Sequence, residues 1–91
     1  MKNELIMIVE DVFYITGRGT IVTGQIEIDK VEIEQMVIVD PEYLPKFSAE
    51  IKGIESFRKQ LKIASRNEYV GLLLLGVDKG KIKKKMKIYL A

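Results

Sequence analysis

The chain has 91 residues, of which 47% are hydrophobic and 31% are charged, a composition typical of one small globular domain with a thin core. It contains neither cysteine nor histidine, which excludes disulfides, thiolate nucleophiles, Cys/His zinc sites and Ser-His triads. A net charge of +2 is too small to indicate a nucleic-acid partner by itself.

Apolar and polar residues alternate along much of the chain, which is the pattern of half-buried β-strands. Residues 20–28 alternate in this way, and the parity then changes at Asp29 and Lys30, which predicts a turn or bulge there. Residues 36–39 form a short apolar stretch that predicts a strand ending at Asp40. Residues 41–46 hold both prolines and are predicted to form a loop.

The second half of the chain continues the same pattern. Residues 47–51 alternate, and Gly53 interrupts the alternation, which predicts a bulge or a corner of a bent strand. Residues 70–75 are uniformly apolar, which predicts a strand that is buried on both sides or lines a closed barrel. Residues 78–85 are compatible with one helical turn despite Gly80, and residues 87–90 predict a terminal strand.

No segment keeps helical spacing of apolar residues for three turns, so six or seven short strands predict an all-β domain. At this length a small closed barrel is favoured, because closure removes exposed sheet edges. The longest apolar run, Val70 to Val77, is far shorter than the roughly 20 residues of a membrane span. No signal peptide is visible, so we expect a cytoplasmic protein without a membrane partner.

The residues that could carry chemistry do not form a catalytic pattern. Gly17-Arg18-Gly19 and Gly24 lack the spacing of a dinucleotide or phosphate loop, and we expect a turn in which glycine supplies positive φ. Glu10 and Asp11 are neighbours, so in a strand their carboxylates would point to opposite faces and act as surface acids. The sequence therefore predicts no enzyme, and it indicates neither a cofactor nor a metal.

Two basic segments leave two interpretations open. Six lysines fall within residues 79–87, and they form either a solvated face or a patch that contacts phosphates. Phe57-Arg58-Lys59 places an aromatic ring beside two cations, a combination that can stack on and grip nucleic acid. In the alternative interpretation the phenylalanine belongs to the core and the cations are solvated.

Three segments resemble, in order and at similar spacing, the second domain of elongation factor Tu. Residues 9–24 (VEDVFYITGRGTIVTG) are similar to the family pattern IEDVFSI-[ST]-GRGTVVTGR. Residues 53–59 (GIESFRK) are similar to GVEMFRK, and residues 69–76 (YVGLLLLG) to NVGLLLRG. The resemblance covers most of the chain and implies a six-stranded antiparallel Greek-key barrel of the translation-factor domain-2 type, here without the GTPase domain or the third domain.

The resemblance implies a binding module of protein biosynthesis with no GTPase activity of its own. In the family this domain holds the aminoacyl end of tRNA and lies near ribosomal RNA. By this resemblance Phe13 packs against the terminal adenine and Glu10 contacts its sugar or base edge. The implied aminoacyl-end residues are Glu10, Asp11, Phe13, Thr23 and Tyr69, and the implied RNA phosphate contacts are Arg18, Arg58 and Lys59.

The chain departs from the family pattern at the site and at turns. Tyr69 replaces an asparagine that lines the aminoacyl pocket, and Leu75 replaces an arginine. Glu34 and Asn67 stand where the family has turn glycines. We expect the Tyr69 ring to lie over the pocket, near Phe13 and Glu10, and to remove discrimination between charged and uncharged tRNA ends; Tyr69→Asn would open the pocket. Losses at turns and at the site, with the strands kept, suggest a retained fold and a relaxed function.

Two functional hypotheses remain from the sequence. The first is a module that binds tRNA or ribosomal RNA weakly, alone or beside a GTPase partner protein. The second is a stand-alone barrel that mediates protein interaction or homo-oligomerisation, because Leu75 and the apolar run before it can expose an apolar patch. Whether the chain is a piece of a longer factor or a free-standing relative stays open.

Overall fold

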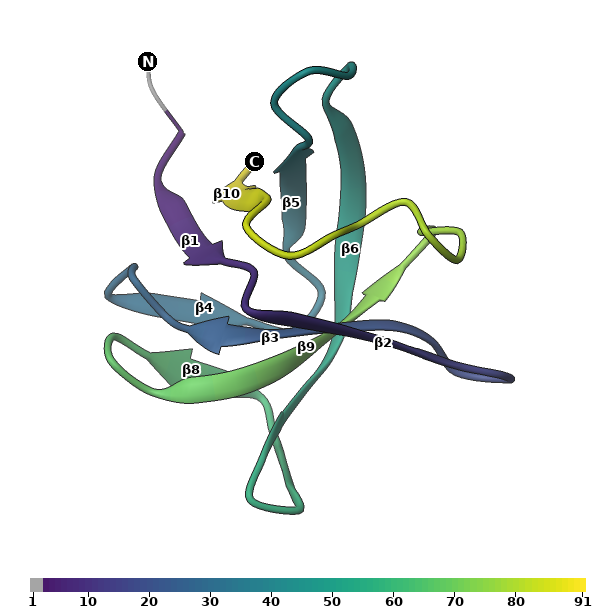
Figure 1. Ribbon diagram of the computed structural model, residues 1–91. Helices are drawn as coiled ribbons and strands as arrows, with labels where there is room; N and C mark the ends of the chain where they lie inside the picture. Colours follow the sequence, from purple (N-terminus) through teal and green to yellow (C-terminus); the bar gives the residue numbers. More distant parts are fainter. Residues whose placement is uncertain (1–2) are drawn as a thin grey trace.

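The computed structural model describes residues 3–91, and this range contains ten β-strands and no helix (Figure 1). The all-β prediction is therefore confirmed. The strands are β1 (Leu5–Ile8), β2 (Asp11–Ile15), β3 (Gly19–Gln25), β4 (Lys30–Glu32), β5 (Met36–Asp40), β6 (Phe47–Ser56), β7 (Lys59–Leu61), β8 (Ile63–Ser65), β9 (Tyr69–Leu75) and β10 (Lys87–Leu90).

One long antiparallel sheet organises the molecule. Its strand order is β1-β10-β5-β6-β9-β3-β2, with β7 paired to β6, while β4 and β8 form a separate two-stranded sheet. The 10-residue strand β6 connects two groups of strands, since its first half pairs with β5 and its second half with β9 and β7. Figure 1 shows β5 and β6 running across the direction of β2, β3 and β9.

A register shift in β6 explains this change of direction. The pairing of β6 with β9 is irregular between Ile51 and Gly53. Ala49 and Ile51 are buried before the shift, and Ile54 is buried after it, so the inward-facing parity changes as an inserted residue requires. The bulge predicted from the glycine at this parity break is confirmed.

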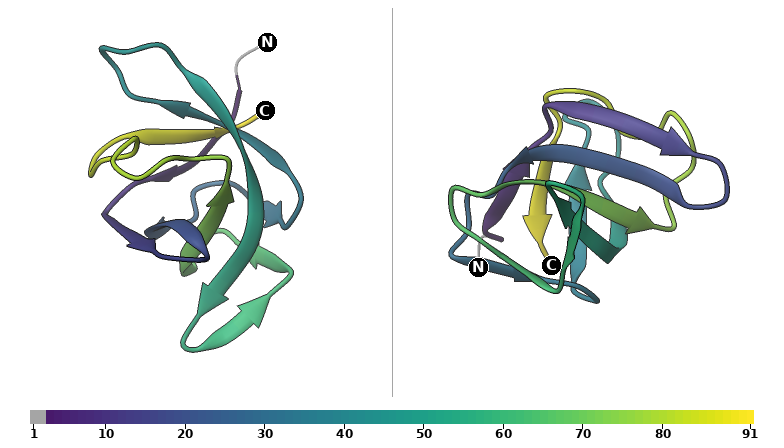
Figure 2. Two further views of the ribbon diagram at one scale, coloured as in Figure 1. Left: turned by 90° about the vertical axis from the view of Figure 1, so that its right-hand side faces the viewer. Right: turned by 90° about the horizontal axis from the view of Figure 1, so that it is seen from below.

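The strand pairing does not close the sheet into a barrel. Strands β1 and β2 stand at its two ends and do not pair with each other. The first and last strands of the chain are neighbours, because β1 pairs with β10 (Figure 2). A single backbone hydrogen bond of 2.7 Å, from the Glu27 N–H to the Ile6 carbonyl, joins β1 to the segment after β3. The closed six-stranded Greek-key barrel stays a prediction.

The core is built from alternate residues of the strands. In β9, Val70, Leu72 and Leu74 are buried, whereas Gly71 and Leu73 are half-buried and Leu75 is 51% exposed. The prediction that this apolar run is buried on both sides is therefore wrong, because the strand has one inner and one outer face. Other large, fully buried side chains come from six further strands and two connections: Ile6, Met7, Val9, Val22, Ile26, Val31, Val37, Ile51, Ile54 and Ile88.

The predicted helical turn at residues 78–85 is also wrong. This connection between β9 and β10 consists of tight turns, with positive φ at Gly80 (84°) and Lys85 (74°) that no helix accommodates. Its last part is held by the Lys85 N–H, which donates to the carbonyl of Val9 at 2.7 Å. The loop predicted at residues 41–46 and the turn predicted around Gly17 are both confirmed.

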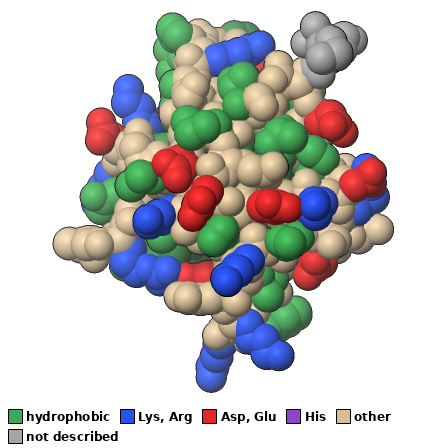
Figure 3. Space-filling model, turned by 180° about the vertical axis from the view of Figure 1, so that it is seen from behind, with side chains coloured by type: hydrophobic (Ala, Val, Ile, Leu, Met, Phe, Trp, Pro, Cys, Tyr) green, Lys and Arg blue, Asp and Glu red, His purple; other side chains and the backbone are tan. Residues whose placement is uncertain are grey.

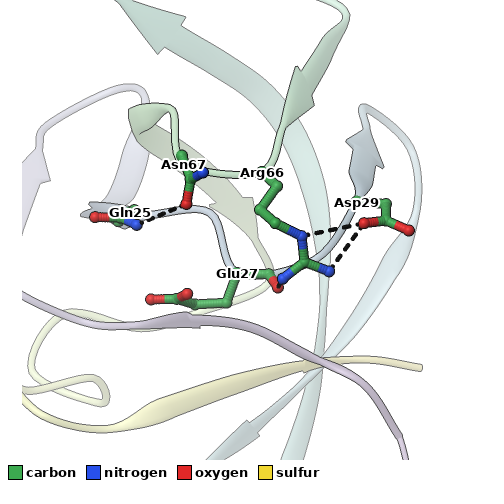
Figure 4. A network of polar contacts seen from close by, with 5 residues as sticks. All are labelled: Gln25, Glu27, Asp29, Arg66 and Asn67. Carbon is green, nitrogen blue, oxygen red and sulfur yellow. Dashed lines mark hydrogen bonds and ion pairs between the residues drawn. The ribbon is translucent and has the colours of Figure 1, made fainter.

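A polar network fixes the predicted turn between β3 and β4 (Figure 4). The Arg66 guanidinium donates to Asp29 Oδ1 from Nη2 at 2.9 Å and from Nε at 3.1 Å, and also to the Glu27 carbonyl. The Gln25 side-chain amide donates to Asn67 Oδ1 at 3.1 Å. The contacts join the chain after β3 to the β8–β9 turn, so β3 ends at Gln25 and a bend follows.

The two positions where the sequence lacks expected turn glycines adopt the backbone that glycine favours. Glu34 and Asn67 both have a φ of 75°. Asparagine tolerates this left-handed region better than most residues. The turns are thus kept without their glycines.

Within residues 3–91, no helix is long and apolar enough to cross a membrane.

Candidate binding groove

The outer face of β2, β3 and β9 brings two of the sequence motifs together, residues 9–24 and residues 69–76. Thr23 in β3 lies opposite Asp11 in β2 on one side and Gly71 in β9 on the other. Ile21 in β3 lies opposite Phe13 in the same way. Residues directly opposite each other in antiparallel strands share a face, so these five positions form one continuous surface.

An open groove of about 660 Å³ crosses this surface. Its lining residues come from the β2–β3 hairpin, the end of β6 with its following turn, and the middle of β9: Val12, Phe13, Tyr14, Ile15, Ile21, Thr23, Glu55, Ser56, Phe57, Arg58 and Gly71. Gly71 lies at the floor, because a Cβ at this position would stand 3.2 Å from Ile21 Cγ2 and 3.7 Å from Thr23 Cγ2. The missing side chain leaves the depression open.

Aromatic rings stand on both sides of the groove and face solvent. Phe13 is 50% exposed on β2, and Phe57 is 95% exposed in the turn after β6. Large apolar side chains are usually buried, and an exposed pair flanking one depression is a surface suited to a planar ligand. Thr23 and Glu55 add a hydroxyl and a carboxylate to the lining.

An ion pair ties the two sides of the groove together. Arg18, in the turn between β2 and β3, donates from Nη2 to Glu55 Oε1 near the end of β6. The two side chains are 43% and 35% exposed, so solvent screens the interaction and its contribution to stability is modest. The contact connects the β2–β3 turn to the end of β6.

The turn between β6 and β7 has an unusual backbone. Phe57 and Arg58 both have positive φ, at 47° and 67°, and Ser56 pairs directly with Lys59. A two-residue hairpin turn of this kind normally carries asparagine and glycine. The hairpin projects downward in Figure 1, and Figure 3 shows basic side chains gathered at the lower end of the molecule.

The groove unites three of the eight residues that the sequence assigned to RNA binding. Phe13, Thr23 and Arg58 line it. The other five, Glu10, Asp11, Arg18, Lys59 and Tyr69, lie around it without lining it. Sequence reasoning missed Glu55 and Gly71, although both lie inside the matched motifs GIESFRK and YVGLLLLG. The signal that could have found Gly71 was a glycine in the middle of an otherwise apolar strand.

Tyr69 lies next to Thr23 at the end of this surface. Its hydroxyl donates to Thr23 Oγ1 at 3.2 Å, and its side chain is half-exposed. The Glu10 N–H donates to the Thr23 carbonyl at 2.8 Å, which places Glu10 beside the same residue through the backbone. Contact of the Tyr69 ring with Phe13 and Glu10 stays a prediction.

The groove offers binding groups and no arrangement typical of a metal site. Within residues 3–91, no cluster of three or more aspartates and glutamates is placed to hold a metal ion. Every buried side-chain nitrogen or oxygen in this range has a hydrogen-bond partner. No model of a known protein family matches the sequence. The resemblance to the second domain of elongation factor Tu therefore remains a prediction from its motifs.

Proposed function

We propose that this chain is a binding module that resembles domain 2 of elongation factor Tu and holds the terminal nucleotide of an RNA, such as the aminoacyl end of tRNA, in the groove. The observation that carries the proposal is the meeting of Phe13, Thr23 and Arg58 in one open groove, although two different motifs supply them. The same proposal includes the closed six-stranded Greek-key barrel of that family.

The lining fits an unpaired nucleotide. Aromatic side chains stack on bases regardless of sequence, and Phe13 and Phe57 present exposed rings on the two sides of the groove. The Arg58 guanidinium supplies a cation for a phosphate, and the Thr23 hydroxyl can hydrogen-bond a ribose. The Glu55 carboxylate accepts hydrogen bonds only, so it suits a sugar hydroxyl or a base amino group.

Binding by the isolated chain is expected to be weak. Stacking on one aromatic side chain contributes about 1–3 kcal/mol per base, and a single groove supplies few further contacts. We expect a Kd somewhat below about 1 mM, which corresponds to about 4 kcal/mol. Enzymatic activity is no part of the proposal.

Fluorescence anisotropy with a labelled RNA octamer that has a free 3′ end tests the proposal. Phe13→Ala removes the ring on β2 and is expected to weaken binding by about 5- to 150-fold, the equivalent of about 1–3 kcal/mol. Tyr43→Ala is the matched control, since Tyr43 is an aromatic residue that is 90% exposed and lies outside the groove lining. Equal Kd values for the two variants, or no salt-sensitive binding below about 1 mM, would contradict the proposal.

A second candidate is a protein-interaction or oligomerisation module. One observation favours it: Leu75 is 51% exposed on β9 and shares a row with Glu50 and with Met36, which is 46% exposed. Light scattering at high protein concentration distinguishes the two candidates. A dimer that Leu75→Arg dissociates supports the second candidate, and a monomer at all concentrations contradicts it.

A further inference from the structure

The connection between β9 and β10 is strongly basic. It carries five lysines and only one acidic residue, Asp78, and Lys87 follows as the first residue of β10; all six lysines are exposed. We name residues 79–87 the lysine segment; its lysines are Lys79, Lys81, Lys83, Lys84, Lys85 and Lys87. Such a density of like charge within nine residues creates a local positive potential that the net charge of +2 conceals.

The lysine segment lies along β2, the end strand of the main sheet. The Lys79 ammonium stands 5.8 Å from the centre of the Tyr14 ring, and Lys84 Nζ is 3.9 Å from Asp11 Oδ1. The Lys85 N–H donates to the Val9 carbonyl. These contacts hold the segment alongside β2 over about 10 Å, since Asp11 and Tyr14 are three strand residues apart (Figure 2).

Nearby acidic residues neutralise this segment only in part. In the part of the chain that the structure describes, its one ion pair is the long contact between Lys84 and Asp11. Asp40 and Glu42 line the same hollow of about 430 Å³ as four of the lysines, without an ion pair to them. The segment therefore retains an excess of positive charge that is available to an anionic partner.

Tyr14 stands between the lysine segment and the groove. It follows Phe13 on β2, so its ring points to the opposite face of this end strand, where it carries the Lys79 ammonium, although it also contributes to the groove lining. An RNA strand that runs from the groove to the lysine segment therefore passes around the free edge of β2. We propose that the lysine segment binds consecutive phosphates of a single-stranded RNA whose terminal base lies in the groove. This inference rests on the proposed function and extends it from a terminal nucleotide to the strand that leads to it.

The side chains of the segment favour nucleic acid over a membrane surface. Lysines beside exposed aromatic rings are the combination that single-stranded nucleic acids bind. Anionic lipids attract basic segments, and apolar side chains that insert between the lipids strengthen this association. The two large apolar residues here are unsuited to that role, since Ile82 is 3% exposed and Met86 packs against the core.

The test compares two variants that each lose three positive charges. One replaces Lys79, Lys83 and Lys84 of the lysine segment by glutamine. The other replaces Lys30, Lys52 and Lys62, which are also exposed but lie outside the segment and the groove lining. Fluorescence anisotropy with the RNA octamer between 50 and 500 mM salt gives Kd and its salt dependence for wild type and both variants. Circular dichroism checks that each variant is folded.

We expect the segment variant to bind at least about tenfold more weakly at 50 mM salt. The negative slope of log K against log salt should become shallower by about 2, since each of three lost phosphate contacts removes about 0.7. The control variant is expected to keep a slope close to that of wild type. Phe13→Ala should weaken binding while leaving the slope unchanged, which separates the groove from the segment.

Three results would overturn the inference. If the segment variant and wild type have equal slopes while Phe13→Ala still weakens binding, the lysine segment does not contact phosphates. The proposed function then still stands. If both triple variants lose the same affinity for the octamer, the overall charge of the protein accounts for the effect. Binding to vesicles with anionic lipids but not to the octamer contradicts both this inference and the proposed function.

Discussion

The two hairpins that border the groove both contain residues with positive φ, but they place different residue types there. The β2–β3 hairpin places glycines where φ is positive, at Gly17 (85°) in the turn and at Gly19 (125°), the first residue of β3. The turn between β6 and β7 has positive φ at Phe57 and Arg58, which are costly residues there. The first turn is built for stability. The second tolerates strain and exposes its aromatic ring almost completely.

What sets the β6–β7 turn apart is two consecutive left-handed residues beside an exposed ring, since single left-handed residues also occur at Glu34 and Lys85. A left-handed residue that is neither glycine nor asparagine costs roughly 1–2 kcal/mol, and such strain clusters at functional sites. Nothing in the core requires a phenylalanine at position 57, since its side chain is 95% exposed. The proposed function gives these two residues a role, because Phe57 and Arg58 both line the groove.

The largest effect is expected from making the glycine turn resemble the strained one. Gly19→Ala places a Cβ at a φ of 125°, a region that is essentially restricted to glycine, and should lower the free energy of unfolding by roughly 1–3 kcal/mol. Thermal unfolding measures this change. Thr16→Ala in the same connection is the control and should change stability by less than about 0.5 kcal/mol. A Gly19→Ala variant as stable as wild type contradicts the assigned role of glycine.

The reverse change should relieve the strained turn. Phe57→Asn combined with Arg58→Gly installs the pair that two-residue hairpin turns prefer, and should raise the free energy of unfolding by about 1–2 kcal/mol. The same variant should bind the RNA octamer more weakly than wild type, because it loses a ring and a cation. A variant that is more stable and binds equally well would show that the strain has no link to binding.

The smallest effect is expected from the link between the hairpins. A double-mutant cycle with Arg18→Ala and Glu55→Ala should give a coupling energy of about 0.2–1 kcal/mol, because both side chains are partly solvated. The exposed pair of Lys30 and Glu32, 3.0 Å apart, provides a reference cycle. If RNA binding depends on how far apart the two hairpins lie, Arg18→Ala and Glu55→Ala should change the Kd for RNA. Variants of Lys30 and Glu32 should leave this Kd unchanged.

Much of the strand pattern followed from periodicity. The bulge at Gly53, the bend after β3 and the loop at residues 41–46 were predictable because each is marked by a parity break or by proline. An exposed apolar patch at Leu75 was among the possibilities that the sequence raised, but the alternation of buried and outer residues along β9 was not predictable, because an apolar run gives no sign of which alternate residues face solvent. The turns at residues 78–85 were mistaken for a helical turn for a similar reason, since lysines suit a helix as well as a loop.

The candidate site was only partly predictable. The motifs pointed to Phe13, Thr23 and Arg58, and these residues do share the groove. The meeting of β6 with β9 next to β3 is a long-range contact, so the contribution of Glu55 could not be inferred from local spacing. The strain at Phe57 was equally hidden, since no rule of sequence predicts a left-handed phenylalanine.

The most direct test of the groove is a titration followed by backbone amide NMR shifts. Isotopically labelled protein is titrated with a trinucleotide that has a free 3′ end. We predict saturable shifts at Thr23, Glu55 and Gly71, on three different strands that meet only in the folded groove. Shifts confined to the lysine segment, or no saturable shifts at millimolar ligand, would contradict the central claim that the groove holds the terminal nucleotide.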